Sequence, residues 1–175
     1  MAPCFSKSPG ATSMSCEECW VTMAENDASA VKAMVLAKSL RRVVTTRKIA
    51  VVVCEGVSDI YRKLLQATFD QCLKLDMPYE RNGVPLRFYV KVFCWSMPFM
   101  RKCIFLDYQT MVVKNCDELF DFPGTLALCD NENYLETSVM IFEPSFEDYV
   151  DLCTWLRPGK LHKSKLKPVH HHTGP

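Results

Sequence analysis

Two side chains with oxygen donors follow a short apolar run near the middle of the chain. The run is Cys103 to Leu106, bounded on its amino side by Arg101 and Lys102, and Asp107 and Gln109 come after it. It predicts a buried parallel strand, whose carboxyl end is where open α/β sheets bind ligands. If the chain stays extended there, both side chains point to one side of the sheet. Because carboxylate and amide oxygens suit Mg²⁺ or Mn²⁺, the pair predicts a divalent metal site.

Further strands are expected on both sides of this run. Each is a short stretch rich in apolar or β-branched side chains and ends near a turn signal. They are Cys19–Met23, Ile49–Cys54, Phe69–Asp76, Thr125–Cys129 and Ser138–Phe142.

Helical patterns alternate with these strands. After a turn and helix cap at Asn26 and Asp27, apolar residues recur at helical spacing from Ala33 to Leu40. Three further helices are expected, with apolar faces made of Val57, Ile60, Tyr61, Leu64 and Thr68 after a cap at Ser58, of Leu86, Val90, Phe93 and Met97 before Pro98, and of Phe146, Tyr149, Val150 and Cys153. This alternation predicts a Rossmann-like α/β domain with a mostly parallel sheet.

Length and composition indicate one domain. A chain of 175 residues, 49% hydrophobic, can bury one substantial core. We place the domain at residues 18–156. It follows a flexible leader at 1–17 and precedes a basic, disordered tail at 157–175, which holds five Lys or Arg residues and no acidic residue.

The chain shows no membrane or export signal. No run of about 18 apolar residues could span a bilayer, and the start lacks the apolar segment of a secretory signal, so we expect a cytoplasmic protein. Its ten cysteines are then expected to be free thiols. Cys16 and Cys19 have the spacing of half a zinc site, but no second pair follows. The basic tail lacks interleaved aromatic residues, so no nucleic-acid partner is expected.

Seven stretches in a fixed order resemble a known family. They are WVTMAENDA at 20–28, VLAKSL at 35–40, VSDIYRKLL at 57–65, KVFCWS at 91–96, the strand before Asp107, NCDELFD at 115–121 and VMIFEPS at 139–145. Together they are similar to glycogenin and its relatives in glycosyltransferase family eight, which include galactinol synthase. The resemblance runs from about Trp20 to about Trp155. It implies the α/β fold of nucleotide-sugar transferases of the GT-A type, with only the N-terminal part of the family domain present.

The resemblance also implies a set of site residues. A UDP-sugar would contact Met23, Asn26, Lys91, Asp107 and Tyr108, and Mn²⁺ would be held by Asp107 and Gln109 in the place of the family's Asp-x-Asp motif.

The chain departs from the family at several of these positions. Gln109 stands in place of the second carboxylate, and Ser29 in place of an aromatic residue that stacks on the base. Glu136-Thr137-Ser138 stands where a family turn contacts the donor sugar. The similarity ends after Trp155, so the family's third metal ligand has no counterpart. We therefore expect Mn²⁺ binding to be weak or lost.

Three functions remain open on this evidence. The first is transfer of glucose from UDP-glucose to a protein or glycan acceptor, as in glycogen initiation, impaired by the departures above. The second is a non-catalytic, truncated family member that binds a partner, such as a glycogenin-like subunit or a glycan enzyme. The third is an unstable product of a truncated gene.

Each site residue also has a structural interpretation. Asp107 and Gln109 could form an ordinary turn at the end of a strand. Lys91 could be a solvated residue on its helix. Asn26 and Asp27 could act as helix caps alone.

Overall fold

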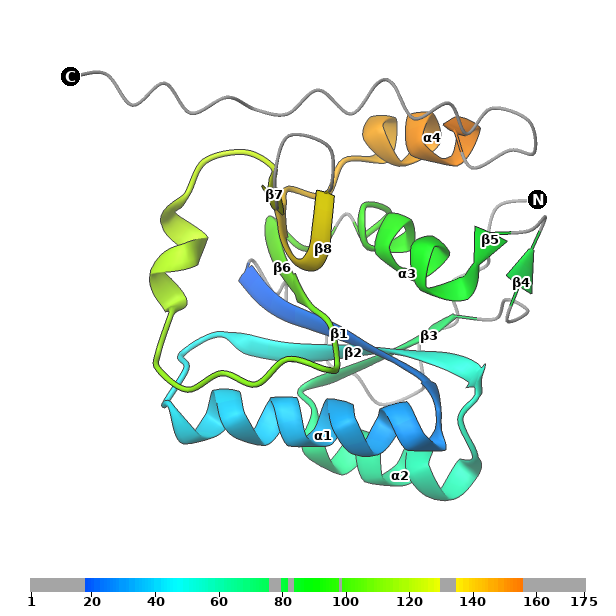
Figure 1. The fold of residues 1–175 in the computed structure, drawn as a ribbon, viewed down its shortest axis with the longest axis vertical. Coiled ribbons are helices and arrows are strands. Elements are labelled where there is room, and N and C mark those ends of the chain that lie inside the picture. The colour runs from blue at the N-terminus through cyan, green and yellow to red at the C-terminus, as the bar shows by residue number, and fades with distance from the viewer. Residues whose placement is uncertain (1–17, 76–79, 82–83, 98, 130–134, 156–175) are drawn as a thin grey trace.

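A six-stranded sheet forms the centre of the molecule (Figure 1). The computed structural model describes residues 18–75, 80–81, 84–97, 99–129 and 135–155. The strand order is β3-β2-β1-β6-β8-β7. The bounds are β1 Glu18–Asn26, β2 Lys48–Gly56, β3 Gln71–Leu75, β6 Lys102–Leu106, β7 Leu126–Cys129 and β8 Leu135–Phe142, and a separate pair consists of β4 Glu80–Arg81 and β5 Val84–Pro85.

Helices cover both faces of this sheet (Figure 1). On one face lie α1 (Asp27–Arg42) and α2 (Asp59–Thr68), and on the other lie α3 (Leu86–Cys94) and α4 (Phe146–Trp155). Because strand side chains alternate between the two faces, the sheet contributes to two separate hydrophobic cores. The short 3₁₀ helix η1 (Asp117–Asp121) places Phe120 in the core on the α1 side.

The predicted mostly parallel α/β fold is confirmed. Strands β3, β2, β1 and β6 are parallel neighbours, each reached from the previous one through a helix or a longer connection. Strand β8 instead runs antiparallel to β6, and β7 antiparallel to β8. A parallel pairing of β7 with β8 would need a crossover of a dozen or more residues, and the five residues between these strands are too few. The start of β8 therefore lies beside the end of β6.

Lys102 does not bound the strand before Asp107, as the sequence suggested, but lies inside it. Its side chain is 4% exposed. Its ammonium donates to the carbonyl oxygen of Phe120 at 3.0 Å and to that of Phe122, and lies 3.5 Å from the Glu143 carboxylate. A buried charge is tolerated here because it is hydrogen-bonded and paired.

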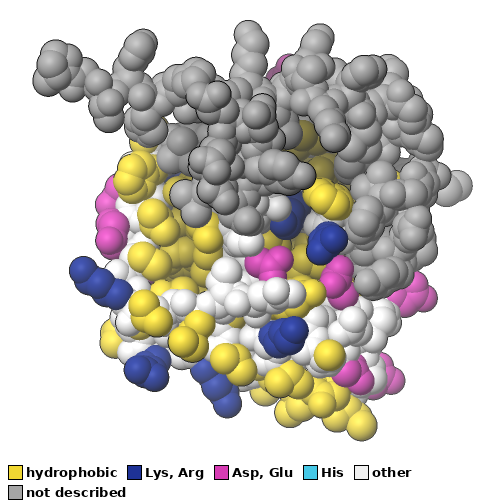
Figure 2. Space-filling model, viewed as in Figure 1, with side chains coloured by type: hydrophobic (Ala, Val, Ile, Leu, Met, Phe, Trp, Pro, Cys, Tyr) yellow, Lys and Arg dark blue, Asp and Glu magenta, His cyan; other side chains and the backbone are white. Residues whose placement is uncertain are grey.

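The predicted apolar face of α2 is wrong. Ile60 and Leu64 are 72% and 46% exposed, whereas Leu65 is completely buried. The packed row is Val57, Tyr61 and Leu65, spaced four residues apart. Two apolar stripes run along this helix, and the sequence alone does not say which one meets the sheet. The outward stripe adds to the hydrophobic surface that Figure 2 shows over the α1 and α2 layer.

The last helix, α4, is rotated in the same way relative to its prediction. Phe146 and Val150 are 69% and 46% exposed, and Tyr149 and Leu152 are the residues that pack on the core beneath α3. The face of α4 that packs on the core is therefore the one that carries Tyr149 and Leu152.

The cysteines of the described residues behave as small apolar side chains. The seven with a described environment are free thiols, and Cys19, Cys54, Cys94 and Cys103 are buried. Burial raises the pKa of Cys54 to about 12 and that of Cys72 to about 11, so both stay protonated near neutral pH. Cys16, the leader and the tail from 157 onward lie outside the described residues.

Candidate functional site

Asp107 begins a tight turn immediately after β6. Its amide donates to the carbonyl oxygen of Ser138 on β8 at 2.8 Å, and its Oδ1 accepts from the amide of Gln109 at 3.0 Å. Its carbonyl oxygen accepts from the amide and the hydroxyl of Thr110, at 2.9 and 2.7 Å. The condition of an extended chain is therefore not met here, and the strand-end turn is present. Strand β8 anchors the backbone of that turn.

A cavity of about 260 Å³ lies between this turn, α3 and the start of β8. Its lining consists of Arg87, Phe88, Lys91, Asp107, Gln109, Thr137 and Ser138. Three predicted site residues, Lys91, Asp107 and Gln109, thus share one pocket at the carboxyl end of β6, the edge where ligands bind in α/β sheets.

Lys91 is held in a fixed place rather than exposed to solvent. It is 8% exposed, and its ammonium donates to the carbonyl oxygen of Thr137 at 2.8 Å and to the hydroxyl of Thr137 at 2.5 Å. The same ammonium lies 5.3 Å from the centre of the Phe105 ring, a favourable cation–π distance. The solvated interpretation of Lys91 is therefore wrong, because these contacts fix the ammonium between α3, β6 and β8.

Arg87 is a pocket residue that the sequence interpretation missed. It lies four residues before Lys91 on α3, so both side chains project from the same helix face. That spacing was visible in the sequence and could have identified it.

Asn26 caps α1 and does not line the pocket. Its Oδ1 accepts from the amide of Ser29 at 3.0 Å, while the Ser29 hydroxyl accepts from the amides of Asn26 and Glu25 at 2.9 and 2.8 Å. The two residues form a capping box. The helix-cap interpretation of Asn26 is confirmed, and its nucleotide contact stays a prediction. Ser29, at the family's aromatic position, is 4% exposed and engaged in the box.

Met23 and Tyr108 also lie away from the pocket lining. The Met23 side chain is completely buried in the core on the α3 side, and its contact with a UDP-sugar stays a prediction. Tyr108 donates its hydroxyl hydrogen to Glu25 Oε2 at 3.1 Å, and the pKa of Tyr108 is raised by burial and then by the Glu25 carboxylate. Tyr108 therefore joins the turn after β6 to the end of β1.

Gly56 is required where β2 comes closest to β1. A Cβ at Gly56 would lie 2.5 Å from the backbone oxygen of Glu25, far inside any real contact. A side chain here would displace the segment that holds Glu25 and Tyr108.

The predicted metal ligands do not complete a metal site by themselves. Asp107 offers one carboxylate, whose Oδ1 already accepts a hydrogen bond, and Gln109 offers one uncharged oxygen. Among the described residues no group of three His, Cys, Asp or Glu side chains could hold a metal ion. Without phosphate oxygens from a bound nucleotide, Mg²⁺ or Mn²⁺ would need more oxygen ligands than this pair offers, so these two residues alone do not fit a resident ion.

Comparison with known proteins shows the family of this chain. No family model matches it. It is 34% identical to human glycogenin-1 over 150 residues, which is 78% of this chain and 42% of that protein. It is 35% identical to glycogenin-1 of Caenorhabditis elegans, over 77% of this chain and 34% of that protein. The chain is a glycogenin-like protein.

Other similarities agree with this placement. The glycogenin-like chain is 34% identical to inositol phosphorylceramide glucuronosyltransferase 1 of Arabidopsis thaliana, over 72% of this chain and 24% of that protein. Its fold matches the galactosyltransferase LgtC, solved with donor and acceptor sugar analogues, with a TM-score of 0.61 at 16% identity over 78% of this chain and 61% of LgtC. The predicted GT-A fold is therefore confirmed. The chain spans less than half the length of the glycogenins named above.

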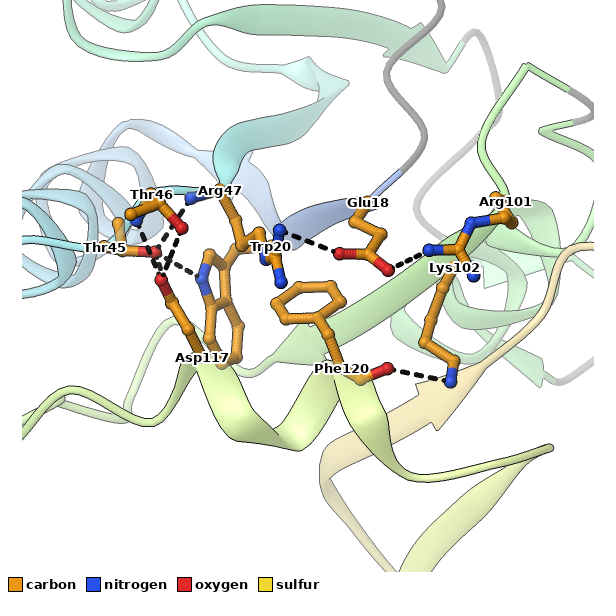
Figure 3. A network of polar contacts seen from close by, with 9 residues as sticks. All are labelled: Glu18, Trp20, Thr45, Thr46, Arg47, Arg101, Lys102, Asp117 and Phe120. Carbon is orange, nitrogen blue, oxygen red and sulfur yellow. Dashed lines mark hydrogen bonds and ion pairs between the residues drawn. The ribbon is translucent and has the colours of Figure 1, made fainter.

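The glycogenin-like stretch at 115–121 lies where β2 and β6 begin, whereas the pocket lies where β6 ends. Figure 3 shows Asp117 and Phe120 of this stretch with their partners. Asp117 accepts from the Thr45 hydroxyl at 2.6 Å and from the Thr46 amide at 2.8 Å, and Trp20 Nε1 donates to the same Thr45 hydroxyl at 2.9 Å. Burial would raise the pKa of the Asp117 carboxyl, but the hydrogen bonds from Thr45 and Thr46 hold it below its ordinary value. This stretch therefore ties η1 to the loop before β2.

The described part of the chain contains no helix that is both long and apolar enough to cross a membrane.

Proposed function

We propose that the pocket between α3, the turn after β6 and the start of β8 binds the diphosphate of a UDP-sugar. We further propose that the chain is part of a glycosyltransferase that passes glucose from UDP-glucose to a protein or glycan acceptor. The observation that carries the proposal is that Lys91 on α3 and the turn residues Asp107 and Gln109 line one pocket at the carboxyl end of β6.

The relatives support the choice of ligand. The glycogenins match over most of this chain, and a 28% identical relative is named a putative UDP-glucuronate:xylan alpha-glucuronosyltransferase. LgtC shares the fold and was solved with donor and acceptor sugar analogues. Since the chain spans only 42% of human glycogenin-1, the activity of the whole protein is part of the proposal.

The pocket residues suit a diphosphate leaving group. Loss of a sugar from UDP places growing negative charge on the phosphate oxygens, and fixed positive charge nearby stabilises that state. Lys91 supplies such a charge, and its bonds to Thr137 keep it in position before a ligand arrives. Thr137 and Ser138 add polar groups on the β8 side. We propose that transfer is nevertheless slow, because Gln109 removes a carboxylate that the family uses.

Thermal unfolding with UDP-glucose tests the binding proposal. A ligand that binds only the folded state raises its stability, by about 2.7 kcal/mol when its concentration is 100 times Kd. We expect millimolar UDP-glucose to raise the unfolding temperature of the wild-type chain and of the surface control Lys63→Met, and to raise that of Lys91→Met less. An unchanged temperature for the wild-type chain at millimolar UDP-glucose would refute the proposal.

A second candidate function is binding without turnover. The observation that favours it is the incomplete donor set of Asp107 and Gln109. On this proposal the chain is a cytoplasmic partner of an intact glycogenin-like subunit or of a glycan enzyme. A radiolabelled UDP-glucose transfer assay on the chain alone, and on the chain mixed with such a subunit, separates the two functions. Transfer by the chain alone would exclude the second.

A further inference from the structure

We propose that Arg87 and Lys91 together neutralise the diphosphate of the bound nucleotide, so that binding at this pocket needs no divalent metal ion. The inference rests on the proposed function, because it concerns how the same pocket holds a UDP-sugar. It assigns a binding role to Arg87 and removes the metal requirement that the family resemblance implies.

The first argument is a count of charges around the pocket. In the family pattern two carboxylates and one divalent ion cancel, and a lysine adds one positive charge. Here Asp107 supplies one negative charge, and Arg87 and Lys91 supply two positive charges. Counted over these lining residues, both arrangements carry one net positive charge. The single positive charge of Arg87 therefore equals the net charge that the missing carboxylate and the ion would have contributed together.

The second argument is the placement of the two cations. Arg87 and Lys91 are four residues apart on α3, so they project from one face of the helix into the same pocket. Two like charges at this spacing repel each other, and an anion between them offsets that repulsion. A guanidinium can also contact phosphate oxygens with two parallel hydrogen bonds, which a lysine cannot do.

The third argument is that the pocket walls are joined to one another. The Lys91 ammonium bonds to Thr137 at the start of β8, and the neighbouring Ser138 carbonyl accepts from the Asp107 amide. The cation and the turn after β6 are therefore anchored on the same strand. A site whose charged groups are already in position loses little conformational entropy when a ligand binds.

The fourth argument concerns the turn itself. Asp107 Oδ1 accepts from the Gln109 amide, and this bond closes the turn that brings both side chains to the pocket. Gln109 adds no negative charge beside this carboxylate to attract an ion. The turn is therefore closed by bonds within the chain, and one carboxylate is the only negative charge it brings to the pocket.

Calorimetric titration of UDP-glucose into the full chain tests this inference. The titration is made once with EDTA and once with Mn²⁺, on the wild-type protein and on Arg87→Met, Lys91→Met and Lys63→Met. We expect the wild-type Kd with EDTA to lie within about threefold of that with Mn²⁺, and Arg87→Met to weaken it about tenfold, equal to about 1.4 kcal/mol. Lys63→Met removes an exposed charge from α2 and should leave the Kd unchanged.

The outcomes separate this inference from the proposed function. Binding that requires Mn²⁺ would overturn the inference and leave the UDP-sugar proposal standing. Metal-free binding unaffected by Arg87→Met would overturn the role of Arg87. No binding under either condition would overturn the proposed function itself. Because Arg87 is exposed and Lys91 is buried, Arg87→Met decides the result even if Lys91→Met fails to fold.

Discussion

Similar polar groups are arranged differently at the two ends of the sheet's strands. These ends are called here the amino edge, where the strands begin, and the carboxyl edge, where the parallel strands end. At the amino edge, where β1, β2 and β6 begin, charges meet one another directly: Glu18 pairs with Arg47 at 3.0 Å and also with Arg101 (Figure 3). At the carboxyl edge Arg87, Lys91 and Asp107 surround a cavity instead. Groups that close on each other stabilise the fold. Groups that line a cavity can contact a ligand within it.

Aromatic side chains pack tightly at the amino edge. Phe120 is 2% exposed and meets the Trp20 ring edge-on, with ring centres 4.9 Å apart, and the Arg47 guanidinium lies 5.3 Å from the Phe120 ring centre. Hydrogen bonds from Thr45 and Thr46 to Asp117 join this packing to the loop before β2. Substitutions here should therefore change stability and leave ligand binding alone, and the reverse should hold at the pocket.

The largest effect is expected from Phe120→Ala. Removing a buried aromatic ring destabilises a protein by about 3–5 kcal/mol, because transfer energy is lost and a cavity remains. Urea unfolding measures this value, and the Kd for UDP-glucose should not change in the fraction that stays folded. The exposed neighbour Phe122→Ala is the control and should cost much less. A loss of UDP-glucose binding in folded Phe120→Ala protein would contradict the claim that the amino edge serves stability and the carboxyl edge serves binding.

A smaller effect, about 1–2 kcal/mol, is expected from Asp117→Asn, because the charge and one acceptor are lost from bonds with Thr45 and Thr46. The pKa of the Asp117 carboxyl is lower in the folded chain than in the unfolded chain. Its contribution is therefore fully present above the unfolded pKa of about 3.9 and is lost as the pH falls through the folded value.

Unfolding at two pH values checks the Asp117 prediction. The difference between wild type and Asp117→Asn should be large at pH 7 and should shrink below about pH 4. Asp121→Asn, an exposed carboxylate on the same short helix, should show no such difference at either pH. A difference for Asp117→Asn that is independent of pH would mean that its charge does not matter.

At the pocket, Gln109→Asp should raise the affinity for Mn²⁺ about tenfold, because a carboxylate attracts a divalent ion that an amide only contacts. UDP should then bind better with Mn²⁺ present than absent, whereas transfer of labelled glucose should stay near background. Calorimetry with Mn²⁺ and UDP, and a radiolabelled transfer assay, measure both. Unchanged affinity for Mn²⁺ would mean that positions 107 and 109 do not face a common site.

The sequence predicted the order of strands and helices because each core strand is a short apolar run with clear turns around it. It failed where several arrangements fit one pattern. The helix α2 carries two apolar stripes, and only the packing on the sheet shows that Leu65 rather than Leu64 is buried. Lys102 looked like a boundary because its partners, the carbonyl oxygens of Phe120 and Phe122, are brought to it only by the fold.

The candidate site shows the same limit. Lys91 and Asp107 were predicted from the family resemblance and lie on one pocket. Asn26 and Met23, predicted in the same way, are engaged in a helix cap and in the core. The bonds of Asp117 at the amino edge were missed because their partners lie 71 and 72 residues away in the chain. Local spacing carries no information about such contacts.

An assigned amide NMR spectrum recorded during addition of UDP-glucose, with EDTA present, tests the comparison most directly. Binding at the carboxyl edge should shift the amide signals of residues 87–91, 107–110 and 137–138, and leave those of Thr45, Thr46 and Asp117 in place. Shifts concentrated at Thr45, Thr46 and Asp117, or no shifts at millimolar UDP-glucose, would contradict the account.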